Sequence, residues 1–131
     1  MNLGQCHNFS DFRTLAKKRL PGPIFHYIDG AADDEVTYKR NSQSFNDVDL
    51  VPNVLAGVEE VDMTTKIMGQ ELSMPFYCAP TALQRLFHHE GERAVARAAS
   101  SSGTMFGVSS LATVTVEDIA KISTGPKMFQ F

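Results

Sequence analysis

Three positions combine residue types that could hold a small molecule. The loop Pro80-Thr81-Ala82 follows a short apolar run, Ser109 follows a second such run, and Gln130 lies within a third. The loop offers small side chains, one hydroxyl and accessible backbone groups, at the place where parallel sheets bind their ligands. The hydroxyls of Thr81 and Ser109 could equally be ordinary strand-end caps, and Gln130 a strand amide facing a barrel interior.

A histidine pair and a tyrosine could suggest a metal site and a substrate contact, but each has a simpler structural interpretation. His88 and His89 are adjacent, whereas a helical zinc pair needs histidines about four residues apart, so we predict no metal site. Tyr27 lies in an apolar stretch, where a tyrosine is commonly a core residue with its hydroxyl at the rim.

Repeated sequence patterns predict the strands and helices that would position these three candidate sites. The apolar run 76–79 must stop at Pro80, which lacks the N–H that a sheet needs. A helix is predicted from Glu90, with Glu90 and Glu92 in its first turn, where carboxylates favour the helix dipole. Gly103 ends that helix, and Thr115 caps the next one. The second and third predicted strands span residues 104–108 and 127–131.

Consecutive βα units predict a parallel sheet in an α/β fold, either doubly wound or closed into a barrel. An eight-stranded barrel typically needs about 250 residues, and the chain has 131. The third strand would have no helix to cover it and no neighbour on its outer edge, and parallel strands need both. We therefore expect the chain to be part of a larger fold.

The residues before the first strand predict a helical segment over 1–60, expected to pack on the barrel, and a β-hairpin over 61–74. Three helices are expected in the segment: one capped by Ser10, one opened by Pro23, and one that starts at 33–35 and runs to Phe45. The pair Gly69-Gln70 is expected to join the two strands of the hairpin. The remaining residues, 75–131, hold the βα units.

Composition limits the class of protein. The formal net charge is −3 and Lys17-Lys18-Arg19 is the only basic run, so we expect no nucleic-acid partner. No apolar stretch approaches the roughly 20 residues of a membrane span, and the N-terminus lacks the pattern of a signal peptide. These features favour a cytoplasmic location. A disulfide between Cys6 and Cys78 is not expected.

Four blocks of sequence, in order and in register, resemble the FMN-dependent α-hydroxy acid dehydrogenases and oxidases. The resemblance covers nearly the whole chain. The sequence of its first block is most similar to that of bacterial L-lactate dehydrogenases. The blocks are PGPIFHYIDGAADDEVTYKRN from Pro21, APTALQRLFHHEGERAVARAA from Ala79, GVSSLATVTVEDIA from Gly107 and MFQF from Met128.

The resemblance implies the N-terminal part of a (β/α)8 TIM barrel and a flavin, FMN, across the carboxyl ends of its strands. The loop Pro80-Thr81-Ala82 would run against the flavin ring and ribityl chain, Ser109 would bind FMN, and Gln130 would reach the edge of the isoalloxazine. Tyr27 would donate its hydroxyl to the substrate carboxylate. Leu111 occupies a place that tunes substrate size in relatives. Backbone donors and amides can stabilise negative charge on a reduced flavin.

The family's catalytic His-Gly-x-Arg block, a lysine near the flavin and a tyrosine just past the third strand are not in this sequence. We therefore expect the 131 residues alone to be inactive and the complete enzyme to oxidise an L-2-hydroxy acid, with L-lactate as the first expectation. The resemblance also implies a homo-oligomer, a tetramer, and peripheral contact at the inner face of the plasma membrane through an electron acceptor. The alternatives are an inactive fragment that serves as an assembly piece, and a different FMN barrel such as an isomerase.

Overall fold

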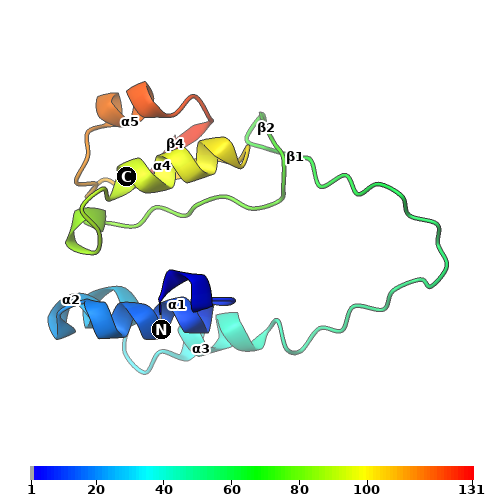
Figure 1. The fold of residues 1–131 in the computed structure, drawn as a ribbon, viewed down its shortest axis with the longest axis horizontal. Coiled ribbons are helices and arrows are strands. Elements are labelled where there is room, and N and C mark those ends of the chain that lie inside the picture. The colour runs from blue at the N-terminus through cyan, green and yellow to red at the C-terminus, as the bar shows by residue number, and fades with distance from the viewer. Residues whose placement is uncertain (1) are drawn as a thin grey trace. The chain divides into compact units, whose positions relative to one another are not determined.

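A computed structural model of the chain describes residues 2–131, which form two compact units. The first unit ends at Gly57 and the second runs from Val58 to Phe131. Figure 1 colours the helices of the first unit from blue to cyan and the elements of the second from green to red. No helix among residues 2–131 combines the length and apolar character that crossing a membrane requires.

The first unit is helical, as predicted, but its first helix is capped by a different residue. The side-chain oxygen of Asn8 accepts a hydrogen bond from the Asp11 N–H at 3.0 Å, so Asn8 is the N-cap. The prediction of Ser10 was therefore wrong, because asparagine caps at least as well as serine and begins the helix two residues earlier. The helices are α1 Phe9–Arg19, α2 Gly22–Asp29 and α3 Val36–Gln43, after a short 3₁₀ turn at Leu3–Gln5.

The third helix begins later than predicted. Residues 33–35 were expected to form its first turn, but Glu35 is the N-cap, in a left-handed conformation with φ of 58°. The Glu35 carboxylate instead accepts a hydrogen bond from the Ala31 N–H at 3.1 Å, which stabilises the turn before the helix. Likewise, Pro23 takes the second position of α2, because Gly22 takes the first.

One ion pair ties α1 to α2. The Arg13 guanidinium donates from Nε to Asp29 Oδ1 at 2.5 Å and from Nη2 to Oδ2 at 2.9 Å. This pairing lowers the pKa of Asp29, and raises that of Arg13 above its usual range. Leu15 of α1 and Phe25 of α2 are the buried apolar residues of this unit.

The second unit starts with the predicted hairpin. Strands β1 Thr65–Ile67 and β2 Gln70–Leu72 pair antiparallel, with Ile67 opposite Gln70. The turn consists of Met68 and Gly69, with φ of 50° and 79°, one residue earlier than the predicted pair. Two consecutive positive φ angles are typical of the tight turns that close two-residue hairpins.

The remaining strands are parallel, as predicted, and they are short. Strand β3 Phe106–Val108 pairs with β4 Lys127–Phe129, and Gly107 lies opposite Met128. The predicted strand 76–79 is reduced to one parallel bridge, between Cys78 and Phe106. Prolines at positions 75 and 80 bracket this segment, and a residue without an N–H cannot extend the ladder.

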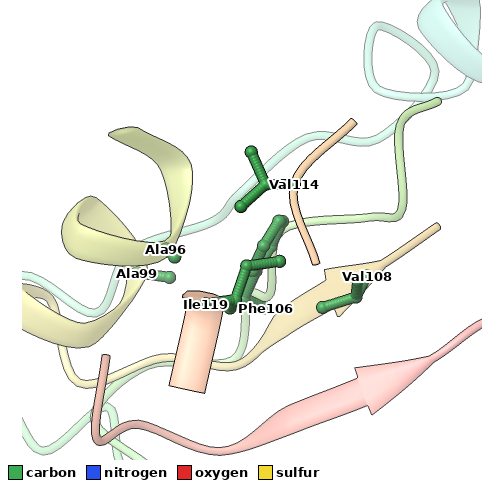
Figure 2. Packing of buried hydrophobic residues seen from close by; sticks show 6 residues of the cluster. All are labelled: Ala96, Ala99, Phe106, Val108, Val114 and Ile119. Atoms are coloured by element: carbon green, nitrogen blue, oxygen red, sulfur yellow. The ribbon is translucent and has the colours of Figure 1, made fainter. Parts of the chain in front are cut away.

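Two helices cover one face of these strands and form the core. Helix α4 Glu92–Ser101 follows the first strand segment, and α5 Val116–Ile122 follows β3, capped by Thr115 as predicted. Figure 2 shows the side chains that meet between α4, α5 and β3. They are Ala96, Ala99, Phe106, Val108, Val114 and Ile119. The core thus holds the strand ends in place from one side.

Candidate functional site

The loop that follows Cys78 and the residues that follow β3 and β4 lie at one edge of the parallel strands. Because Cys78, β3 and β4 run in the same direction, Pro80, Ser109 and Gln130 all come after their carboxyl ends. The Gln130 N–H continues the ladder by donating to the Val108 carbonyl at 2.9 Å. The structure therefore brings together the segments that hold the candidate residues of the second unit.

The Pro80 loop packs directly against β3 because position 107 is glycine. A Cβ at Gly107 would lie 2.8 Å from Pro80 Cδ, 2.9 Å from Pro80 N and 3.0 Å from the Cys78 carbonyl oxygen. Two of these three atoms belong to the backbone, so no side-chain rotation could relieve the contact. The missing side chain of Gly107 allows the loop to sit where it does.

The tip of this loop presents unused backbone donors. Within residues 2–131, the N–H groups of Thr81 and Ala82 donate to no protein acceptor, and Thr81 is exposed. Leu83 then anchors the loop, because its N–H donates to the Leu111 carbonyl at 3.1 Å. Two adjacent free N–H groups form an arrangement that can bind an anionic or carbonyl oxygen.

Ser109 and Gln130 differ in their exposure. Ser109 is buried, with 4 % of its surface exposed, and its hydroxyl oxygen accepts a hydrogen bond from the Leu111 N–H at 3.2 Å. Gln130 is exposed, and so is Leu111. The Ser109 hydroxyl donates no hydrogen bond within the described residues, and the Gln130 amide is exposed.

A buried carboxylate, Glu92, joins the loops that hold Gln84 and Thr113 at this edge, whereas the sequence pattern predicted only a favourable interaction with the helix dipole. Its Oε1 accepts hydrogen bonds from the N–H groups of Thr113 at 2.8 Å and Gln84 at 3.4 Å, and its Oε2 accepts one from the Thr113 hydroxyl at 2.7 Å. Glu92 has 0 % of its surface exposed. Gly91 before it has φ of 51°, and a Cβ there would lie 2.6 Å from Arg85 Cγ. The missing side chain at position 91 thus leaves room for Arg85 beside the start of α4.

The pKa of Glu92 results from two opposing effects. Burial is the largest single effect and raises the pKa, but hydrogen bonds from the Thr113 hydroxyl, the Thr113 N–H, its own N–H and the Gln84 N–H together outweigh it. The pKa therefore lies below its usual 4.5. No ion pair among the described residues includes Glu92, so neutral donors stabilise its charge.

This shift predicts a specific acid sensitivity. Because the pKa of Glu92 is lower in the folded state than in the unfolded state, its ionisation stabilises the fold above the unfolded pKa. That contribution is lost as the pH falls through the folded pKa. Glu92→Gln cannot titrate, so its free energy of unfolding should fall less steeply below about pH 5 than that of the wild type. Urea unfolding at a series of pH values checks this; parallel curves would contradict it.

The other candidate residues lie elsewhere or have partners of their own. Tyr27 belongs to α2 in the first unit and is 53 % exposed. His88 and His89 are in contact as a tilted ring pair, and His88 Nδ1 accepts a hydrogen bond from the Glu90 N–H at 3.3 Å. Residues 2–131 contain no cluster of three or more histidine, cysteine or acidic residues that could hold a metal ion. Cys6 and Cys78 are both free thiols.

A family model described as FMN-dependent dehydrogenase matches residues 16–131. The chain belongs to this family. Glycolate oxidase 1 of Zea mays is 38 % identical over 128 residues, which cover 98 % of this chain and 35 % of that protein. A Mycobacterium tuberculosis protein provisionally named L-lactate dehydrogenase is 41 % identical over 129 residues, which cover 98 % of this chain and 31 % of the relative.

Solved structures of family members have the same fold. An oxidised active mutant of (S)-mandelate dehydrogenase matches with a TM-score of 0.88 and 34 % identity, over 99 % of this chain and 36 % of the other. Mandelate oxidase matches with a TM-score of 0.85 and 36 % identity, over 92 % and 36 % of the two chains. The chain thus spans about a third of the length of these relatives, and it forms the N-terminal part of a (β/α)8 barrel.

FMN is the cofactor of this family, and the carboxyl edge of the strands is compatible with such a group. The missing side chain at Gly107 lets the Pro80 loop lie against β3, and the loop tip carries free N–H groups. A buried hydroxyl, Ser109, lies at the end of the same strand. Backbone donors, small side chains and a hydroxyl are the groups that can approach a flavin and its ribityl chain closely.

Proposed function

We propose that this chain is the FMN-binding N-terminal portion of an enzyme that oxidises an L-2-hydroxy acid, L-lactate in the first instance, to the 2-oxo acid. The observation that carries the proposal is the close packing of the Pro80 loop against β3 at Gly107. This junction places backbone donors and a hydroxyl at one edge of the strands, in a chain whose family uses FMN. Relatives named for glycolate, lactate and mandelate support 2-hydroxy acids as the substrate class.

In this proposal, the residues of the second unit position the cofactor. The N–H groups of Thr81 and Ala82 donate to it, Pro80 sets the direction of the loop, and Ser109 donates its hydroxyl proton. Gln130 reaches it with an amide. Bound FMN supplies the acceptor for the two electrons that a hydroxy acid loses when it becomes an oxo acid. Donors held in place by the strand ends favour negative charge on the cofactor without reorganising.

Tyr27 is the proposed substrate-binding residue of the first unit. A phenol hydroxyl can donate to a carboxylate without adding a permanent charge to the site. A hydrogen bond to a charged group contributes about 1.5–3 kcal/mol. The tyrosine would thereby orient the substrate while other residues of the enzyme perform the proton transfer.

Replacing Tyr27 with phenylalanine tests this role. In the complete protein we expect kcat/KM for the hydroxy acid to fall by about 10- to 100-fold while the FMN content stays unchanged. Tyr38→Phe, on α3 of the same unit, is the matched control and should alter neither quantity. Loss of flavin in Tyr27→Phe would contradict the assignment.

Two measurements test the function itself. Sequencing the coding region beyond the Phe131 codon shows whether the frame continues into a lysine and a His-Gly-x-Arg block, as an active enzyme would require. Anaerobic addition of L-lactate, glycolate or L-mandelate to the purified complete protein should then bleach the flavin absorbance, fastest with the true substrate. A flavin that no hydroxy acid bleaches would indicate another FMN enzyme, and a frame that stops would indicate an assembly piece.

A further inference from the structure

We propose that Glu92 is a positioning residue that fixes loop 79–86 and loop 109–115 to each other, so that both present their donors to the flavin together. The inference rests on the proposed function, since it assigns to these loops the contact with FMN. Glu92 lies within the second block of the resemblance, but neither the roles that the resemblance implies nor the candidate site residues named from the sequence include it. The tertiary structure places its buried carboxylate between the loops.

The hydrogen bonds of Glu92 reach both loops at once. Thr113, in loop 109–115, donates its N–H at 2.8 Å and its hydroxyl at 2.7 Å, and Gln84, in loop 79–86, donates its N–H at 3.4 Å. A further bond runs directly between the loops, from the Arg85 N–H to the Thr113 hydroxyl oxygen at 3.2 Å. The carboxylate is thus the shared acceptor of a network that spans the edge.

The same network extends to the tip of the first loop. The Gln84 side-chain amide donates to the Thr81 carbonyl at 3.2 Å, and Gln84 is itself buried, with 8 % of its surface exposed. Glu92 therefore connects through Gln84 to Thr81, one of the proposed flavin contacts. A shift of the carboxylate would move the backbone on which the free N–H groups of Thr81 and Ala82 depend.

Burial raises the free-energy cost of breaking this hydrogen-bond network. An ionised carboxylate without a counterion is costly to bury unless donors satisfy it, so removing the acceptor leaves buried donors unpaired. Glu90, two residues earlier, provides the contrast. It pairs with Arg97 at the surface, where ion pairs contribute little. Glu90 lies just before α4 and Glu92 is its first residue, but of the two carboxylates only that of Glu92 accepts hydrogen bonds from the loops.

Two pairs of variants separate positioning from simple stabilisation. Glu92→Gln keeps an oxygen for the backbone donors but offers an amide to the Thr113 oxygen, which already accepts from Arg85, and it leaves the Thr113 hydroxyl proton without an acceptor. Glu90→Gln is the matched control, because it removes the same charge without touching a loop. Thr113→Val removes only the hydroxyl, and Thr113→Ser restores it.

The experiment measures the FMN dissociation constant of the complete apoprotein by flavin fluorescence, at a temperature where every variant is folded. We expect Glu92→Gln and Thr113→Val to raise it by about tenfold, and Glu90→Gln and Thr113→Ser to leave it within about twofold. Amide hydrogen exchange should show faster exchange confined to residues 83–85 and 111–113, with α5 unaffected. Thermal unfolding is recorded alongside, because a purely structural residue would lower the melting temperature alone.

The outcomes are distinct. Unchanged FMN affinity in Glu92→Gln and Thr113→Val, with or without a lower melting temperature, would overturn the positioning role. Faster exchange spread evenly over the second unit would also overturn it, because it would show general loosening. A wild-type protein that binds no FMN would overturn the proposed function and the flavin role of Glu92 with it, and exchange confined to the loops would then show only that Glu92 joins them.

Discussion

Gly107→Ala is expected to weaken FMN binding by about tenfold or more. The added Cβ would lie 2.9 Å from Pro80 N and 3.0 Å from the Cys78 carbonyl oxygen, both backbone atoms. Overpacking of this kind costs about 1–3 kcal/mol and displaces the backbone. Because the Pro80 loop is the part that must move, the proposed flavin contacts of Thr81 and Ala82 move with it. Titration of the complete apoprotein with FMN measures the loss.

Gly125→Ala is the matched control for this substitution. It lies in the same unit, and its added Cβ would come no closer than 3.4 Å to a neighbouring atom, which is ordinary van der Waals contact. We expect its FMN affinity to match the wild type. If Gly107→Ala also bound FMN as the wild type does, the junction of the loop with β3 would have no part in cofactor binding.

Ile119→Ala is expected to produce the largest loss of stability, about 2–5 kcal/mol. Ile119 is completely buried and packs in the cluster that joins α5 to α4 and β3 (Figure 2). Truncation removes apolar contacts and leaves a cavity behind β3, the strand that carries Gly107 and precedes Ser109. Urea denaturation of the complete protein measures the change in free energy of unfolding.

Ile122→Ala provides the comparison on the same helix. Ile122 is 37 % exposed and lies at the last position of α5, so the same truncation there removes less buried surface. We expect a loss of less than about half that of Ile119→Ala. Equal losses for the two variants would contradict the placement of the core between the helices and β3.

Short-range features of the sequence, such as helix caps and prolines, determined where most of the helices and strands begin and end. Thr115 caps α5 because its hydroxyl can accept an N–H of the first turn, and the observed bond is donated by the Asp118 N–H at 3.2 Å. Prolines 75 and 80 limited the first strand segment to a bridge, a restriction that the apolar pattern alone did not reveal. The acidic residues before α3 were misassigned because a carboxylate can stabilise a preceding turn as well as a helix start.

The sequence by itself determined the family, the parallel βα order and the positions of the loops at the strand ends. These follow from short-range patterns, namely apolar runs, caps and four ordered blocks. Only the tertiary structure decided that Glu92 faces inward and joins two loops, because its partners Gln84 and Thr113 lie 8 and 21 residues away in the chain. Periodicity records which face of a helix is apolar. It does not record which distant donors will surround a single carboxylate once the chain has folded.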